Sequence, residues 1–268
     1  MTSPHTRPLD SLSSLAVDIL NTADPAAKIE KTAHAAALLR ASDMAVGQVT
    51  PPSRPARPPK PELRRPGDMP RRSTGPKGRL ALVHALAHIE LTAVDLAWDI
   101  IARFTAANMP RDFYNNWVDV AVEEAEHFTA LAARLLTLGT ACGDLPAHDG
   151  LWETSERTAD DLAARLVLIP MTMEARGLDT TPRTTQLLRQ AGDTETADIL
   201  DVIYTDEIKH LAIGVRWFEF LCAARGAIPT AAYPEILESC FRGGLKGPFN
   251  LEARAQAGMG PDYLRPWL

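Results

Sequence analysis

The chain has 268 residues, 46% hydrophobic and 23% charged, a balance typical of one large soluble domain or of one domain with an appendage. Its net charge of −6 is mild and favours no particular partner. No apolar run reaches the roughly 18–20 residues of a membrane span, and the N-terminus shows no secretory signal. The three cysteines are far apart and form no CxxC, which favours free thiols in a cytoplasmic protein.

The composition and periodicity predict an all-α protein. Aromatic residues make up only 6% of the chain, Ala and Leu are abundant, and no segment alternates with period two. Residues 9–42 predict one or two short amphipathic helices with a break near Asp24-Pro25. Because prolines recur throughout residues 51–79, that segment is expected to be extended rather than helical.

The same proline-rich segment is strongly basic, with nine Lys and Arg residues between Arg54 and Arg79. We interpret it first as a strap across the domain or as a linker. The alternative is a basic arm that binds phosphate or nucleic acid. No aromatic residues are interleaved to stack on bases, and this disfavours nucleic acid without excluding it.

Four long helices are predicted after the strap, at about 78–107, 110–139, 158–178 with a kink at Pro170, and 194–225, with a short helix near 183–191. Residues 140–157 look turn-rich, and the end of the chain looks like an irregular tail that packs back on the helices. The predicted organisation is an N-terminal helical extension (1–50), a Pro/Arg-rich strap (51–77), a four-helix bundle (78–225) and a C-terminal tail (226–268).

Two Glu-x-x-His pairs carry the chemistry, Glu124 with His127 and Glu207 with His210. Residues three apart on a helix share one face, so each pair can reach one metal ion. An isolated glutamate precedes each pair at nearly equal spacing, Glu90 by 34 residues and Glu174 by 33. Two such repeats form the carboxylate-bridged two-metal site of a four-helix bundle.

Each of the four glutamates lies in an apolar stripe of its helix, where an unpaired carboxylate would be costly. Four carboxylates and two neutral imidazoles balance two divalent cations. Hard oxygen donors with imidazole and no thiolate suit two iron ions, or iron with manganese. Six further residues have weaker claims as hydrogen-bond partners, pocket residues or ligands: Glu123, Asp206, Tyr204, His84, His88 and His148.

With these motifs in view, the sequence resembles the ferritin-like family DUF455. The likeness rests on RRSTGPKGR, HALAHIEL with Glu90, EEAEHF with Glu124 and His127, GDLPAHDGLWE, MEARGLD with Glu174, DEIKHLAIG with Glu207 and His210, and KGPFNLEAR. The resemblance implies a ferritin-like fold with a di-metal centre and a remote relationship to the tRNA-hydroxylating MiaE family. It implies no substrate.

The leading functional hypothesis is an O₂-dependent di-iron oxidoreductase, or monooxygenase, acting on an organic small molecule with electrons from a separate donor. Three alternatives stay open. The chain could be a ferritin-like iron-binding, ferroxidase or storage protein, or a MiaE-like tRNA-modifying hydroxylase. It could also be a structural metal bundle without O₂ chemistry. No membrane partner is expected, and a homodimer is compatible with the sequence.

Overall fold

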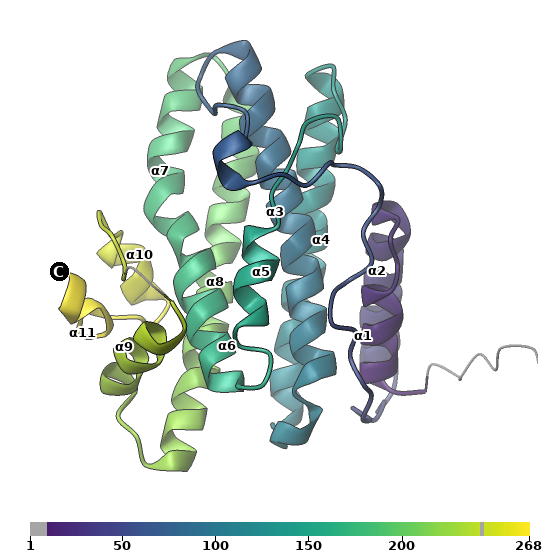
Figure 1. The fold of residues 1–268 in the computed structure, drawn as a ribbon, viewed down its shortest axis with the longest axis vertical. Coiled ribbons are helices and arrows are strands. Elements are labelled where there is room, and N and C mark those ends of the chain that lie inside the picture. Colours follow the sequence, from purple (N-terminus) through teal and green to yellow (C-terminus); the bar gives the residue numbers. More distant parts are fainter. Residues whose placement is uncertain (1–9, 242–243) are drawn as a thin grey trace, which may run out of the picture. The chain divides into compact units, whose positions relative to one another are not determined.

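The computed structural model describes residues 10–241 and 244–268, and within these ranges the chain forms helices and loops without a β-strand (Figure 1). This confirms the predicted all-α class. Residues 1–9, which include the predicted start of the first helix and the segment checked for a secretory signal, lie outside the described residues. The chain divides into two compact units. One contains the described residues up to Pro59 together with Ala93–Ala125, and the other contains Lys60–Thr92 together with Glu126–Leu268.

The first unit begins with two packed helices, α1 (Leu12–Leu20) and α2 (Pro25–Ala41). The predicted break between them is present. The carboxylate of Asp24 caps α2 by accepting a hydrogen bond from the Ala27 backbone N–H at 2.9 Å, and Pro25 occupies the first helical position. Proline suits that position because its missing N–H would have no partner inside the helix.

The remainder of the first unit comprises parts of two long helices, α3 (Pro76–Arg103) and α4 (Arg111–Thr137), and the short η2 (Thr105–Ala107) between them. Asp95 is one of its fully buried polar residues, and its carboxylate forms ion pairs with Lys28 and Arg57. Burial raises the pKa of Asp95 and lowers the pKa of Lys28. Loss of the Asp95 carboxylate would leave the buried Lys28 without its counter-charge, so this ion pair holds α2 against α3.

The proline-rich segment is hydrogen-bonded to other parts of the chain at several points. In the first unit, the Ala56 N–H donates to the Leu20 carbonyl at 2.7 Å, and the Arg103 guanidinium donates to the Pro52 carbonyl at 2.9 Å. In the second unit, Leu63 forms an isolated parallel β-bridge with Ala147. The one-turn helix η1 (Pro66–Asp68) follows. These contacts support the interpretation of the segment as a strap.

The second unit contains α5 (Gly150–Glu156), α6 (Leu162–Leu168), the π-helical η3 (Ile169–Glu174), α7 (Ala175–Gln190) and α8 (Thr194–Arg225). Figure 1 shows α7 running beside α8, and α8 also packs against α6 and η3. Pro170, where a kink was predicted, lies in the π-helical turn, because proline cannot donate the hydrogen bond that a regular turn requires.

Helix α7 continues through Pro182, whereas the sequence predicted an end near 178 and a separate short helix. Pro182 cannot donate to the carbonyl of Leu178, four residues earlier. That carbonyl accepts a hydrogen bond from the Asn250 side-chain amide at 3.2 Å instead. A residue 72 positions away from Leu178 thus satisfies the carbonyl that the proline leaves without its helical partner, and the helix persists.

The predicted irregular tail is largely helical, which corrects that expectation. It contains α9 (Pro229–Cys240), α10 (Leu251–Gln256), α11 (Pro261–Leu264) and η4 (Arg265–Trp267). Tyr233 of α9 is fully buried, with its ring 5.7 Å from that of Tyr263 and 6.5 Å from that of Phe218. Helices this short depend on such packing rather than on propensity, so their sequence signal is weak. Helix α5 was missed for the same reason.

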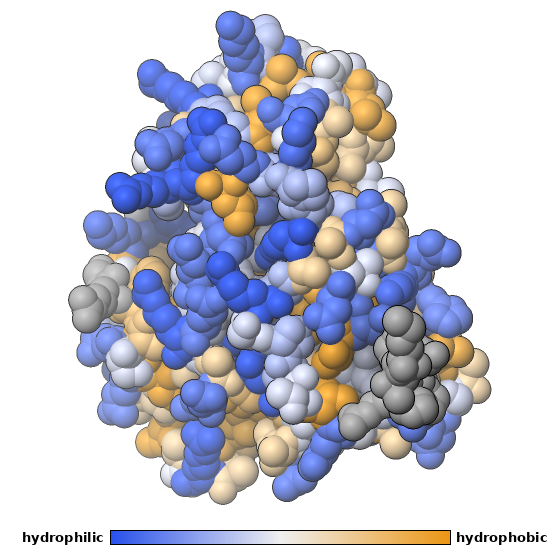
Figure 2. Space-filling model, turned by 45° about the vertical axis from the view of Figure 1, so that its right-hand side comes forward, coloured by the Kyte–Doolittle hydropathy of each residue, from blue (hydrophilic) through white to orange (hydrophobic). Residues whose placement is uncertain are grey.

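Helix α3 is long and apolar enough to cross a membrane by length and composition alone. However, 72% of its most apolar window is buried inside the structure, as in a core helix of a soluble protein. Figure 2 shows mostly hydrophilic side chains on the viewed face, with hydrophobic ones in scattered groups. The exposed large hydrophobic residues, such as Leu136, Val202 and Ile228, are likewise spread over several helices.

Candidate metal centre

Both Glu-x-x-His pairs lie inside long helices, as predicted. Glu124 and His127 are one turn apart on α4 and are 0% and 3% exposed. Glu207 and His210 have the same spacing on α8, where His210 is fully buried and the Glu207 side chain is 13% exposed. The apolar stripe around each pair turns these side chains inward, which is why polar groups occupy the core here.

The structure gathers five of the six predicted ligands into two overlapping groups. One group contains Glu90, Glu124 and His127, and the other contains Glu124, Glu207 and His210. In each group, one ligand atom from every residue lies within 4.8 Å of the others. Glu124 belongs to both groups. A carboxylate has two oxygens, so a residue in this position could bind one ion with each.

His127 is held between two carboxylates. Its Nδ1 lies 3.5 Å from Oε2 of Glu90, and its Nε2 forms a 3.1 Å hydrogen bond with Oδ2 of Asp206. The other histidine has a matching arrangement, with Nδ1 of His210 3.9 Å from Oε2 of Glu207. The two imidazole rings are 5.9 Å apart. In both rings, Nδ1 is therefore the nitrogen that faces a candidate ligand carboxylate.

Asp206 connects this site to the surface. Its second oxygen accepts a hydrogen bond from Nζ of Lys209 at 2.7 Å. Burial raises the pKa of the Asp206 carboxyl, but the hydrogen bonds from Lys209 and His127 outweigh burial and hold the pKa below its usual range. An ionised carboxylate on Nε2 fixes the tautomer in which Nδ1 carries the lone pair. The sequence suggested Asp206 as such a partner, and the structure brings it to His127.

Glu174, the sixth predicted ligand, is in neither group. It is the last residue of the π-helical η3 and is half-buried. A π-helical turn contains an extra residue and shifts the side chains that follow it, and such turns are frequent at functional sites. The one predicted ligand outside the two groups therefore lies at the end of the least regular part of its helix.

The weaker candidates have other roles. Nε2 of His84 accepts hydrogen bonds from the backbone N–H groups of Gly143 (2.9 Å) and Leu145 (3.4 Å), and burial lowers the pKa of His84. Nδ1 of His148 accepts one from the Gly150 N–H. The hydroxyl of Tyr204 accepts one from the Asn250 side chain at 2.9 Å. Neither metal-competent group includes these residues, His88 or Glu123.

The chemistry of the donor set fits a divalent cation. Three carboxylates and two imidazoles converge at largely buried positions, where carboxylates this close together repel one another in a low-dielectric interior. A cation between them removes that repulsion and replaces the lost hydration. Oxygen and imidazole donors without thiolate suit iron, manganese or zinc.

The fold and the donor set define a class: an all-helical protein in which Glu and His side chains of α3, α4 and α8 could hold a metal ion. The chain belongs to the family described as "Protein of unknown function (DUF455)", whose model matches residues 21–265. This confirms the family predicted from the motifs. It is also 40% identical over 208 residues to an "Uncharacterized protein" of Haemophilus influenzae, covering 75% of this chain and 72% of that relative. No solved structure matches the chain significantly.

Proposed function

We propose that the chain is a di-iron carboxylate protein and an O₂-dependent oxidoreductase that acts on an organic substrate. The observation that carries the proposal is that Glu124 belongs to both donor groups. In this arrangement Glu90 and His127 would hold one ion, Glu207 and His210 would hold the other, and Glu124 would be shared between them. Glu174, at the junction of η3 and α7, would be the sixth ligand. The corresponding architecture is a ferritin-like four-helix bundle of α3, α4, α7 and α8.

Bound iron would supply electrons for the reduction of O₂, chemistry that side chains alone cannot perform. The protein contributes a dry, prearranged donor set. His127 is oriented by Asp206, and its Nδ1 faces the candidate ligand Glu90. The burial of Glu90, Glu124 and both histidines excludes bulk water from the donor atoms. A separate reductase or small reductant is required to return iron to the ferrous state.

Anaerobic titration of the metal-free chain with Fe(II), followed by exposure to air in an oxygen electrode, tests this function. We expect about two irons per chain and O₂ consumption that follows iron loading. Glu124→Gln keeps the size of the side chain and removes its charge, and it should reduce both. Glu126→Gln is the matched control, because Glu126 is exposed two residues further along α4. Equal loading of the two variants would disprove the site.

The same titration separates the alternatives. Uptake of many irons per chain, with a large shell-like assembly, would indicate storage. Tight binding of two ions without O₂ consumption would indicate a structural metal site.

One observation favours an RNA substrate as the second candidate. Residues 60–79 contain seven basic and two acidic residues, a local net charge of +5 in a chain of −6 overall. Arg65, Arg71, Arg72 and Lys77 are exposed. Binding of bulk tRNA that weakens steeply with salt, and weakens further in the double variant Arg71→Gln/Arg72→Gln, would support a hydroxylase acting on tRNA. Unchanged binding by that variant would count against it.

A further inference from the structure

A cavity of about 400 Å³ opens in the second unit, between the turn that joins η3 to α7 and the segment that follows α9. Thr172 and Arg176 line one wall, and Phe241 and Phe249 contribute aromatic rings to the other. The volume lies in the range of small-molecule sites, which are mostly apolar with a few fixed polar groups.

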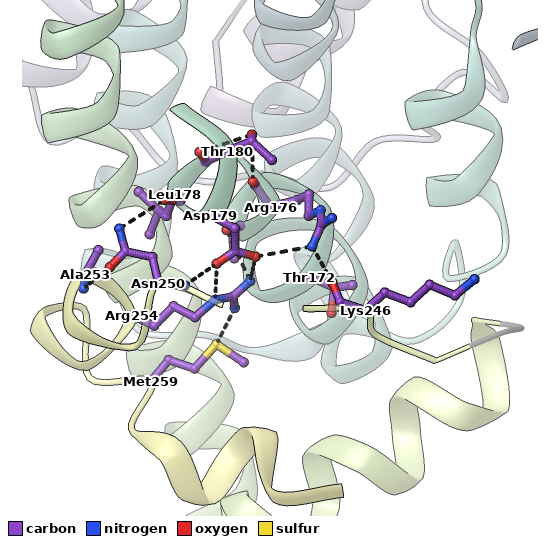
Figure 3. Close-up of polar contacts among 12 residues, drawn as sticks. Thr172, Arg176, Leu178, Asp179, Thr180, Lys246, Asn250, Ala253, Arg254 and Met259 are labelled. Atoms are coloured by element: carbon purple, nitrogen blue, oxygen red, sulfur yellow. Dashed lines mark hydrogen bonds and ion pairs between the residues drawn. The ribbon is translucent and has the colours of Figure 1, made fainter. Parts of the chain in front are cut away.

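A buried ion pair holds one wall in place. The Arg254 guanidinium is 1% exposed and donates to both oxygens of Asp179, from Nε to Oδ1 at 2.9 Å and from Nη2 to Oδ2 at 2.8 Å (Figure 3). Arg254 also donates to the Ala175 carbonyl and to the sulfur of Met259. The Asn250 backbone N–H donates to Oδ1 of Asp179 at 2.9 Å. These bonds tie α7 to α10, so the wall is formed before any ligand arrives.

The cavity has an excess of positive charge. Its lining includes three cations, Arg176, Lys246 and Arg254, and one carboxylate, Asp179, which Arg254 already pairs with. Arg176 lies at the rim with its side chain 48% exposed, 3.7 Å from Asp179 and donating from Nη1 to the Lys246 carbonyl. Figure 3 shows its guanidinium between Asp179 and the Lys246 backbone. This leaves other N–H groups of Arg176 for a ligand.

The residues of η3 and α7 that line the cavity lie on a different side of the helix from Glu174, the candidate metal ligand. Thr172, Arg176 and Asp179 recur at helical spacing and share a face. Glu174 is two residues from both Thr172 and Arg176, which places it about half a turn around the axis. Ligand binding in the cavity is therefore separate from the donor set, and it can be measured without metal.

We propose that this cavity binds a small organic anion with an apolar body. The acidic group would pair with Arg176 and Lys246 at the rim, and the apolar body would lie against Phe241 and Phe249. A guanidinium held by Asp179 and a backbone carbonyl is positioned for a carboxylate or a phosphate, both of which accept its paired donors. The inference concerns a site beyond the proposed metal centre.

Saturation-transfer NMR titrations of the full chain at low salt test the proposal. The probes are benzoate, phenyl phosphate and the neutral isostere benzamide. We expect saturable binding of at least one anion and much weaker binding of benzamide. The tighter of the two anions identifies the acidic group. In Arg176→Gln and in Lys246→Gln, the dissociation constant of that anion should rise, by about tenfold or more for Arg176→Gln.

The matched control is Arg183→Gln, on the same face of α7 two turns beyond the cavity, where the side chain is exposed and does not line the cavity. It should bind the anion as the unaltered chain does. Circular dichroism of each variant checks that the fold is retained. Absence of saturable binding, equal binding of benzamide, or equal affinity of Arg176→Gln and Arg183→Gln would overturn the proposal.

Discussion

At the residue scale, His127 shows how one side chain of the candidate metal site is oriented. Its two nitrogens face different carboxylates, Glu90 on one side and Asp206 on the other. Only the first of these belongs to the donor groups. Asp206 acts through His127 by fixing its ring orientation and tautomer, so it is a positioning residue.

Replacement of Asp206 should therefore weaken metal binding without removing a ligand. In Asp206→Ala, we expect the dissociation constant for Fe(II) or Mn(II) to rise about 10–100-fold. Anaerobic titration monitored by calorimetry measures it. Asp201→Ala is the control, because Asp201 is exposed on the same helix and pairs with Arg189 at the surface. Equal affinities in the two variants would show that Asp206 does not position the ligand.

Asp193 gives a pH-dependent prediction. Its buried carboxylate pairs with Arg134 at 2.8 Å and caps α8 by accepting from the Thr196 N–H. Burial raises its pKa, but the hydrogen bonds from Thr196 and the pairing with Arg134 hold it below the usual range. Asp193→Asn should lower the free energy of unfolding at neutral pH by about 1–3 kcal/mol.

The sign of the pH effect follows from the lowered pKa. The charged carboxylate stabilises the fold fully above the ordinary aspartate pKa of about 3.9, and this contribution is lost as the pH falls through the lower folded-state value. The difference between the unaltered chain and Asp193→Asn should therefore shrink below about pH 4. Urea unfolding over a pH series measures it, with the exposed Asp198→Asn as control. A difference that stays constant down to pH 2.5 would contradict the assignment.

The sequence could point to the five residues that the structure groups, because each Glu-x-x-His motif lies within one helix and the pattern repeats at nearly the same spacing. The sequence could not show which histidine Asp206 contacts, because His127 lies 79 residues away on another helix. The cavity was not predicted, although two motifs of the family resemblance, MEARGLD and KGPFNLEAR, contain Arg176 and other residues that line it. An exposed arginine near a helix start looks like any solvated charge until Phe241, Lys246 and Phe249 are seen to line the same cavity.

At the element scale, the η3 segment depends on close contact with α8. A Cβ atom added to Gly214 of α8 would lie 2.8 Å from Cβ and 2.9 Å from Cγ of Pro170. Real Cβ atoms essentially never approach so closely, so only glycine lets the π-helical turn pack here. The sequence indicated a disturbance at Pro170 but could not indicate which residue of which helix accommodates it.

Gly214→Ala should consequently destabilise the chain by about 1–3 kcal/mol through overpacking. Gly177→Ala should stabilise it by about 0.4–1 kcal/mol, because an added Cβ there meets nothing within 4 Å and alanine restricts the unfolded chain. Both glycines lie in helices, which makes them a matched pair. Urea unfolding at neutral pH measures the two changes. The same sign for both would refute the packing argument.

The long helices were predictable because apolar periodicity and end signals extend over many residues. The end of α8 is an example, where Gly226 adopts a positive φ of 65° as expected of a glycine after a helix. The continuation of α7 through Pro182 was not predictable. It depends on Asn250, whose contribution is visible only when the tail is in place.

At the scale of the whole molecule, metal binding should contribute to stability because the donor groups exist only in the folded chain. Each bound ion at 100 times its dissociation constant stabilises the native state by about 2.7 kcal/mol. For a chain of this length that corresponds to a rise in Tm of roughly 5–10 °C. Differential scanning calorimetry with Mn(II) and with a chelator measures the shift. Glu124→Gln should show little of it, and an equal shift in that variant would place the ions elsewhere.

The strap has a consequence for proteolysis. Four of its basic residues, Arg54, Arg57, Lys60 and Arg65, directly precede a proline, and trypsin does not cleave such bonds. Proline removes the N–H and fixes φ, so the chain there cannot fit the extended substrate site of the protease. In this irregular segment the bonds open to trypsin are those after Arg64, Arg71 and Arg72, all exposed residues. Limited digestion should therefore cut first at these three positions and leave the bonds after the other four intact.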